Sequence, residues 1–178
     1  MAGKKTSSVL PVVVLVTICV IAATLLGIVH QVTEPVIVAA EEREALEIYA
    51  ALCPEASTFE DTGYTSPTCI QAIRALDDSH NTVGHIIISQ GRGYGGQVPL
   101  VVAFDANGSV INLVAIDNEE TPGLGSKACD PTYLEQYADK PAELLGENDV
   151  DLISGATITS KAVLSAFNSA VEAYEEVR

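Results

Sequence analysis

The chain has 178 residues, a net charge of −15 and 48% hydrophobic residues, so its length suits a single domain. Its acidity excludes an ordinary nucleic-acid-binding protein, which must neutralise phosphates with lysine and arginine. Its apolar content excludes a largely disordered chain. The four cysteines form no C-x-x-C pair, which excludes a zinc ribbon, a thioredoxin-type motif and c-type haem attachment.

The segment Val9–Val29 is an uncharged apolar run of 21 residues. As a helix it would span about 31 Å, close to the hydrocarbon thickness of a bilayer. Lys4 and Lys5 precede it and no basic residue follows until Arg43, so the positive-inside rule predicts a cytoplasmic N-terminus. A cleaved signal peptide is the alternative, but its apolar core is usually shorter and ends at small residues. We therefore expect an uncleaved single-pass anchor in the cell membrane, with the rest of the chain outside the cytoplasm.

All 24 acidic residues follow Val29, whereas two of the nine basic residues precede it. We interpret this acidity as a solvated surface rather than as a cation site. After the apolar run, helical spacing continues and places four apolar residues on one face: Ala45, Ile48, Tyr49 and Leu52. The predicted organisation is a cytoplasmic tail (1–8), a transmembrane helix (9–29), a juxtamembrane stalk helix (30–52) and an extracytoplasmic domain (53–178).

Short β-like runs follow the stalk, at residues 69–76, 82–89, 100–104 and 110–116. A glycine-dense loop over 91–96 separates the second and third runs. Asn107-Gly108, between the third and fourth, is a strong hairpin signal. Two helices, at 131–138 and at 161–176, can cover one face of the sheet. The predicted fold class is therefore α+β, an antiparallel sheet covered by helices behind a single N-terminal transmembrane helix.

The segment Asp151–Ser160 is a cluster of small and hydroxyl residues directly before the last predicted helix. Thr159 or Ser160 could cap that helix, and the unpaired N–H groups at its start favour an anionic group. Gly155 allows a close backbone approach, and Lys161 adds a cation. The residues alone leave two interpretations open, a phosphate or carboxylate site and an ordinary capped helix start.

Three motifs resemble those of covalently flavinylated FMN-binding domains. Asp151-x-x-Ser154-Gly155-Ala156-Thr157 resembles the flavin acceptor motif of that family. Two further segments, in the same order as in the family, are Glu120-Thr121-Pro122-Gly123-Leu124-Gly125 and Gly93-Tyr94-Gly95-Gly96. Within the family, this short chain is most similar to the G subunit of Rnf-type ion-translocating complexes. The C subunit of the Na⁺-translocating NADH:quinone reductase is a longer cousin.

The resemblance implies that a flavin transferase uses FAD to attach FMN through a phosphoester to the Thr157 hydroxyl. Thr159 and Ser160 are neighbouring hydroxyls that compete for this assignment. The rest of the motif surrounds the acceptor, and Asp151 is the residue that we expect the transferase to read. The cofactor-binding residues implied in this region are Asp151, Ser154, Gly155, Ala156, Thr157 and Lys161.

The two upstream motifs are implied to lie around the flavin ring, which needs an apolar slot with a few hydrogen bonds. Tyr94 and Leu124 are the expected walls, and Gly123 and Gly125 are expected to bring backbone N–H groups to the ring edge. Glu120 is expected to orient this loop or to hydrogen-bond the cofactor. The residues implied here are Tyr94, Glu120, Thr121, Gly123, Leu124 and Gly125.

The implied function is a membrane-anchored flavoprotein subunit that relays electrons within an ion-translocating ferredoxin:NAD oxidoreductase. Other membrane subunits are its expected partners, and the chain itself has no catalytic residue. One alternative is a stand-alone flavinylated protein for extracellular electron transfer. Another is a non-redox anchored binding module, in which the Ser-Gly-Ala-Thr cluster is only a helix cap.

The remaining cysteines and histidines indicate no metal site. Cys53, Cys69 and Cys129 follow the membrane segment, and Cys53 with Cys69 is the closest pair for a disulfide. Buried free thiols are an equal alternative. His85 lies in a predicted strand, where a structural role is expected.

Overall fold

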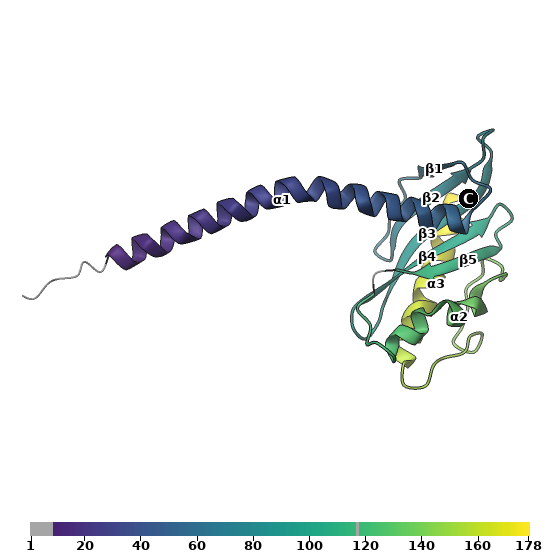
Figure 1. Ribbon diagram of the computed structural model, residues 1–178. Helices are drawn as coiled ribbons and strands as arrows, with labels where there is room; N and C mark the ends of the chain where they lie inside the picture. Colours follow the sequence, from purple (N-terminus) through teal and green to yellow (C-terminus); the bar gives the residue numbers. More distant parts are fainter. Residues whose placement is uncertain (1–8, 117) are drawn as a thin grey trace, which may run out of the picture. The chain divides into compact units, whose positions relative to one another are not determined.

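The computed structural model describes residues 9–116 and 118–178. The expected cytoplasmic tail over 1–8, with Lys4 and Lys5, lies outside the described residues. The chain divides into two compact units, the first ending at Leu46 and the second running from Glu47 to Arg178. The second unit holds the sheet (Figure 1).

Helix α1 (Val9–Leu52) is a single helix of 44 residues, continuous from the predicted membrane segment through the predicted stalk. It is long and apolar enough to cross a membrane. Inside it, the hydroxyls of Thr17 and Thr24 donate to the carbonyl oxygens four residues earlier, at 2.8 and 2.7 Å. These threonines therefore present no unpaired hydroxyl to an apolar environment.

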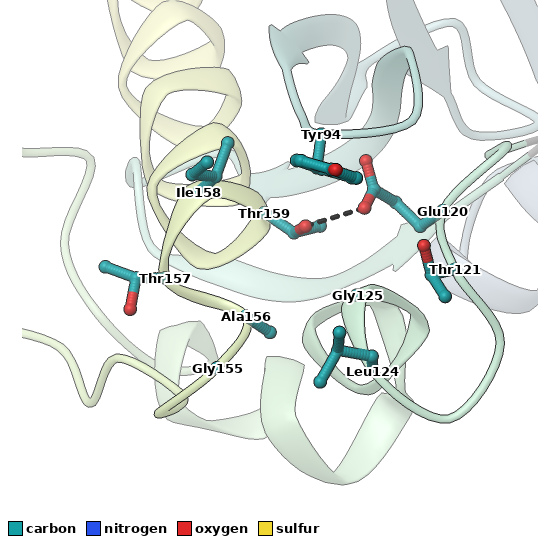
Figure 2. Close-up of a pocket in the computed structure, with 10 residues that line it drawn as sticks. All are labelled: Tyr94, Glu120, Thr121, Leu124, Gly125, Gly155, Ala156, Thr157, Ile158 and Thr159. Carbon is teal, nitrogen blue, oxygen red and sulfur yellow. Dashed lines mark hydrogen bonds between the residues drawn. The ribbon is translucent and has the colours of Figure 1, made fainter.

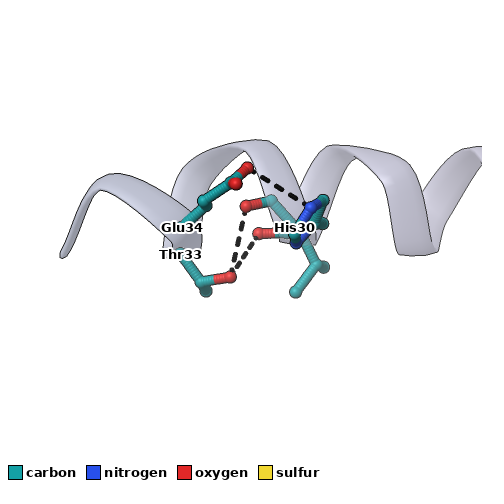
Figure 3. Close-up of polar contacts among 4 residues, drawn as sticks. His30, Thr33 and Glu34 are labelled. Carbon is teal, nitrogen blue, oxygen red and sulfur yellow. Dashed lines mark hydrogen bonds and ion pairs between the residues drawn. The ribbon is translucent and has the colours of Figure 1, made fainter. Parts of the chain in front are cut away.

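The apolar part of α1 gives way to polar side chains about His30. The Nε2 atom of His30 lies 3.3 Å from a carboxylate oxygen of Glu34, one helical turn later (Figure 3). Thr33 donates its hydroxyl to the carbonyl oxygen of Val29 at 2.9 Å. Pro35 follows directly, and its ring nitrogen cannot donate to the helix. This polar turn is where the sequence begins to suit water rather than hydrocarbon.

The second unit is built on a five-stranded antiparallel meander in the order β1-β2-β3-β4-β5. Its strands are β1 (Thr58–Asp61), β2 (Cys69–Leu76), β3 (Thr82–Arg92), β4 (Gln97–Asp105) and β5 (Val110–Ala115). The predicted meander is confirmed. Strand β1 was not expected, because its four residues TFED are largely exposed and carry no hydrophobic alternation.

The turns on either side of β4 differ in how far the sequence predicted them. Strand β3 continues to Arg92, so Gly91 lies in the sheet, paired with Val98, and not in the expected loop. The hairpin between β4 and β5 forms where Asn107-Gly108 predicts it. There an oxygen of Asp105 accepts from the Asn107 N–H at 2.8 Å, and Gly108 has a φ of +85°.

Helix α3 (Thr157–Val177) packs lengthwise on β3 and runs antiparallel to it. Gly91 of β3 faces the backbone of Ala162, and the Ser89 hydroxyl donates to the Ala166 carbonyl oxygen at 2.8 Å. Further along, the ring of His85 meets that of Tyr174 edge-on, with centroids 5.4 Å apart. Figure 1 shows α3 crossing the sheet behind β3 and β4. The small residues of β3 therefore let the start of α3 approach the strand closely.

A long connection leads from β5 to α3 and contains three short helical segments. These are η1 (Gly125–Cys129), α2 (Pro131–Leu134) and η2 (Glu135–Tyr137). The helix predicted at 131–138 exists as α2 and η2, whereas η1 was not expected. The connection is fixed to the core by the ring of Tyr137, which lies 5.0 Å from that of Phe167. The connection is therefore held in a fixed position against the core.

The four cysteines are free thiols, so no disulfide links Cys53 to Cys69. Cys53 and Cys69 are both buried, and Cys129 is half-buried. Burial raises the pKa of Cys53 to about 11, helped by the neighbouring Glu55 carboxylate. These thiols are therefore protonated at neutral pH and act as small apolar groups.

Candidate functional site

A cavity of about 540 Å³ opens where three segments meet, at the N-terminal end of α3. Its size falls within the usual range for a small-molecule site. The turn after β3, the connection after β5 and the first turn of α3 each supply part of its wall (Figure 2). The residues lining it are Tyr94, Glu120, Thr121, Leu124, Gly125, Gly155, Ala156, Thr157, Ile158 and Thr159.

The structure brings together most of the residues that the three motifs single out. Tyr94, four residues of the 120–125 segment and Gly155-Ala156-Thr157 border one cavity. Two lining residues, Ile158 and Thr159, were not among the predicted cofactor contacts. Their position follows from the helix start: the first turn of α3 begins at Thr157, so the next two side chains also reach the cavity.

The predicted start of the last helix at Lys161 is wrong, and so is its predicted capping. The helix begins at Thr157 with Ala156 at the N-cap position, and no side chain caps it. Thr159 and Ser160 lie inside the first turn, and the Ser160 hydroxyl oxygen accepts from the Ile153 N–H at 3.1 Å. The first N–H groups of α3 are consequently free of side-chain partners and can receive an anion.

Three hydroxyl side chains in this first turn have different surroundings. Thr159 is 1% exposed and Ser160 is fully buried, and both make hydrogen bonds inside the protein. Thr157 is exposed, with only a long 3.4 Å hydrogen bond from its hydroxyl to the Ile153 carbonyl oxygen. In Figure 2 it lies at the opposite end of the cavity from Tyr94 and Glu120. Of these three hydroxyl residues, Thr157 is the exposed one, so its hydroxyl is the one that a reaction partner can reach.

Glu120 joins the three segments of the site. Its side chain is buried, with 6% of the residue exposed. One carboxylate oxygen accepts from the Thr159 hydroxyl at 2.7 Å (Figure 2). The other accepts from the Gly95 N–H at 3.0 Å. Charge-assisted hydrogen bonds of this kind are the stronger ones. Glu120 therefore fixes α3 and the β3–β4 turn to the connection.

Glycines make room for this carboxylate. A Cβ atom at Gly93 would overlap one oxygen of Glu120, and a Cβ atom at Gly125 would overlap the other. A Cβ atom at Gly95 would overlap the backbone carbonyl oxygen of Glu119. Gly93, Gly95 and Gly125 thus allow the close packing around Glu120 and its neighbour Glu119.

The mouth of the cavity carries large apolar side chains that are open to solvent. Tyr94 is 75% exposed, Leu124 is 47% exposed and Ile158 is 55% exposed. They come from three different segments and converge on one opening. Clustered apolar exposure of this kind is typical of ligand or partner contact.

Four predicted contacts lie away from the cavity lining. The Lys161 ammonium pairs with Glu147 at 2.7 Å, so it is engaged outside the cavity. The backbone N–H of Gly123 donates to the Ser126 hydroxyl at 2.9 Å and is not directed at a ligand, contrary to expectation. Asp151 and Ser154 are exposed on the approach to Gly155 and do not border the cavity.

Cys129, at the end of η1, is electrostatically coupled to the site. Burial, reinforced by the negative charge of Glu120, raises the pKa of its thiol to about 11. The thiol is therefore protonated at neutral pH. Among the described residues, no group of three or more histidines, cysteines or acidic residues is arranged to hold a metal ion.

Residues 93–172 match the FMN-binding domain family. The matched segment contains the β3–β4 turn, the 120–125 segment and the start of α3. All ten cavity-lining residues lie within it.

The similar whole proteins give more specific information than the domain match does. It is 28% identical to the G subunit of the proton-translocating ferredoxin:NAD(+) oxidoreductase complex of Clostridium ljungdahlii, covering 86% of this chain and 84% of that protein. It is 29% identical to the G subunit of the ion-translocating oxidoreductase complex of Methanosarcina acetivorans, covering 90% and 91%. The chain is thus a homologue of these G subunits over nearly its whole length.

Among solved structures, the crystal structure of Shewanella oneidensis NqrC is similar, with 25% identity and a TM-score of 0.46. The match covers 55% of this chain and 53% of that one, so the chain spans about half the length of that structure.

Proposed function

We propose that this domain carries FMN covalently, through a phosphoester between the flavin phosphate and the Thr157 hydroxyl. The observation that carries the proposal is the exposure of Thr157 at the cavity, beside the buried and hydrogen-bonded Thr159 and Ser160. A transferase can reach only an exposed hydroxyl. The match to the FMN-binding domain family supports the identity of the cofactor.

The start of α3 suits the phosphate end of the cofactor. The phosphodiester keeps a negative charge, which is stabilised by free N–H groups and by the positive end of the helix dipole. Lys161 is paired with Glu147, so in this structure the helix start offers the nearer positive potential. Gly155, with a φ of +86°, lets the chain turn into the helix beside the attachment point.

The opposite side of the cavity suits the flavin ring. Tyr94, Leu124 and Ile158 present exposed apolar surface, which a flat apolar ring would cover. FMN supplies one-electron and two-electron chemistry when bound; the residues of the chain position it and shield part of it from water. An open slot also leaves the ring accessible to a redox partner.

We further propose that the domain relays electrons within an ion-translocating oxidoreductase complex of the Rnf type. Its homologues are named as G subunits of such complexes. Helix α1 would anchor it through residues 9–29, with the tail 1–8 in the cytoplasm, a stalk over 30–52 and the domain from 53 outside. Other membrane subunits would supply and receive the electrons, and a flavin transferase would read the exposed Asp151 during maturation.

The test is in-gel flavin fluorescence of the denatured full chain, expressed together with a flavin transferase. The wild type is expected to fluoresce and Thr157→Ala to be dark. Ser165→Ala removes an exposed hydroxyl further along α3, outside the acceptor motif, and is expected to fluoresce, which makes it the matched control. A dark wild type would instead favour the non-redox binding module. Fluorescence of Thr157→Ala would move the attachment to another hydroxyl.

A further inference from the structure

The Glu120 carboxylate is a buried charge in the wall of the cavity, and its structural contacts account for only part of its chemistry. Both oxygens accept a hydrogen bond, one from the Thr159 hydroxyl and one from the Gly95 N–H. A carboxylate has acceptor sites on both oxygens, so it satisfies both donors at once. Glu120 forms no ion pair with any residue between 9 and 116 or between 118 and 178.

Burying a carboxylate without an ion-pair partner costs desolvation free energy. The fold nevertheless makes room for the Glu120 side chain. Glycine stands at both positions, 93 and 125, where a Cβ atom would collide with its oxygens. A glutamine has a single acceptor oxygen, so it could accept from only one of these two donors. The carboxylate that satisfies both donors also places a negative charge in the wall of the cavity.

We propose that Glu120 is an electrostatic positioning residue that holds the reduction potential of the bound flavin low. This inference rests on the proposed function, because it concerns FMN in the same cavity. Each electron that the flavin accepts from a reductant adds one negative charge, unless a proton enters with it. A fixed negative charge in the wall opposes that addition. Burial protects the effect from salt, since ions in solution screen surface charges far better than buried ones.

The position of the carboxylate determines which part of the cofactor its charge acts on. Glu120 and Tyr94 lie together at the end of the cavity opposite Thr157 (Figure 2). The phosphate end is assigned to Thr157, so the carboxylate lies on the side left for the ring. Its charge therefore acts on the part of the cofactor that gains electrons, rather than on the phosphate.

The experiment is a redox titration of the full chain carrying covalent flavin, with glutamine and aspartate at position 120. Glu120→Gln keeps the size, removes the charge and leaves one acceptor oxygen in place of two, so its flavin potential is expected to rise. Glu120→Asp keeps the charge and shortens the side chain, so its potential is expected to stay nearer the wild type. The rise in Glu120→Gln is expected to persist at high salt.

Glu119→Gln is the matched control, because it removes an exposed charge from the adjacent residue. Its potential is expected to stay close to the wild type, and any small shift is expected to vanish at high salt. Thr159→Val gives an independent test without changing residue 120. It removes the hydroxyl that donates to the carboxylate, so the less stabilised charge is expected to lower the potential.

Several results would overturn the inference. These are an unchanged or lower potential in Glu120→Gln, equal shifts in Glu120→Gln and Glu119→Gln, or equal shifts in Glu120→Gln and Glu120→Asp. If Glu120→Gln does not retain flavin, a raised or unchanged potential in Thr159→Val would still contradict it. Failure of the proposed function looks different, because the wild type itself would then carry no covalent flavin.

Discussion

Replacing Gly91 with alanine tests whether the site depends on the close approach of α3 to β3. Gly91 is the penultimate residue of β3 and is paired with Val98 of β4. A Cβ atom there would fall directly on the carbonyl oxygen of Ala162, in the second turn of α3. The obstacle is helix backbone and not a flexible side chain, so the helix itself must move.

The size of the effect follows from the nature of the clash. Adding a methyl group to a filled interior typically costs about 1–3 kcal/mol, and a backbone obstacle places this case at the upper end. Against this, alanine restricts the unfolded chain and contributes roughly 0.4–1 kcal/mol of stability. A net loss of about 2 kcal/mol corresponds to a fall in Tm of roughly 5–10 °C for a domain of this size.

The assay is thermal unfolding of the full chain in detergent, followed by near-ultraviolet circular dichroism of the buried tyrosines. Gly96→Ala is the matched control, because its Cβ atom would meet only ordinary contacts, at 3.7 Å or more. It is expected to unfold within a few degrees of the wild type. A displaced α3 also moves Thr157, so Gly91→Ala is expected to take up less covalent flavin.

Equal unfolding temperatures for Gly91→Ala and Gly96→Ala would refute the reasoning. That result would mean that α3 can slide away from β3 at little cost. Normal flavin attachment in a destabilised Gly91→Ala would show that the position of the first turn does not depend on this contact.

Three further outcomes are expected. Burial, with a smaller contribution from the positive charge of Arg74, lowers the pKa of His85 below its ordinary 6.5. Below about pH 6.5 the unfolded chain therefore binds a proton at His85 that the folded chain does not bind, which favours unfolding. In thermal melts the wild type should lose stability between pH 7 and pH 5, and His85→Phe should lose less stability over the same range. Ser89→Ala removes the buried hydrogen bond to Ala166 and should cost about 1 kcal/mol in denaturant unfolding, a value near zero contradicting its role. Lys161→Ala breaks an exposed pair with Glu147 and should change stability by less than about 1 kcal/mol and leave flavin attachment intact, whereas loss of attachment would restore Lys161 to the site.

The sequence by itself predicted the features that depend on neighbouring residues. The apolar run from Val9 needs only its own composition to suit a membrane, and α1 is a continuous helix there. Strand β2 has the predicted bounds, and the Asn107-Gly108 hairpin forms as its turn chemistry requires. The three motifs also identified most of the cavity wall, because each is a short contiguous segment.

The first turn of α3 was decided by tertiary contacts. Local chemistry favoured Thr159 or Ser160 as the cap, since hydroxyl side chains are good N-caps. In the folded chain, Thr159 donates to Glu120 and Ser160 accepts from Ile153, so both are drawn inside the helix and Thr157 becomes its first residue. Ile158 and Thr159 enter the cavity wall for the same reason.

The sequence likewise did not predict which groups the charged side chains pair with. Lys161 directly follows the segment Asp151–Ser160, which suggested a phosphate contact, yet it pairs with Glu147 across the surface. Glu120 lies 39 residues before Thr159 and is joined to it by one hydrogen bond. Local propensity is encoded in adjacent residues, whereas the partner of a charge is set by which distant segments the packing of the core brings together.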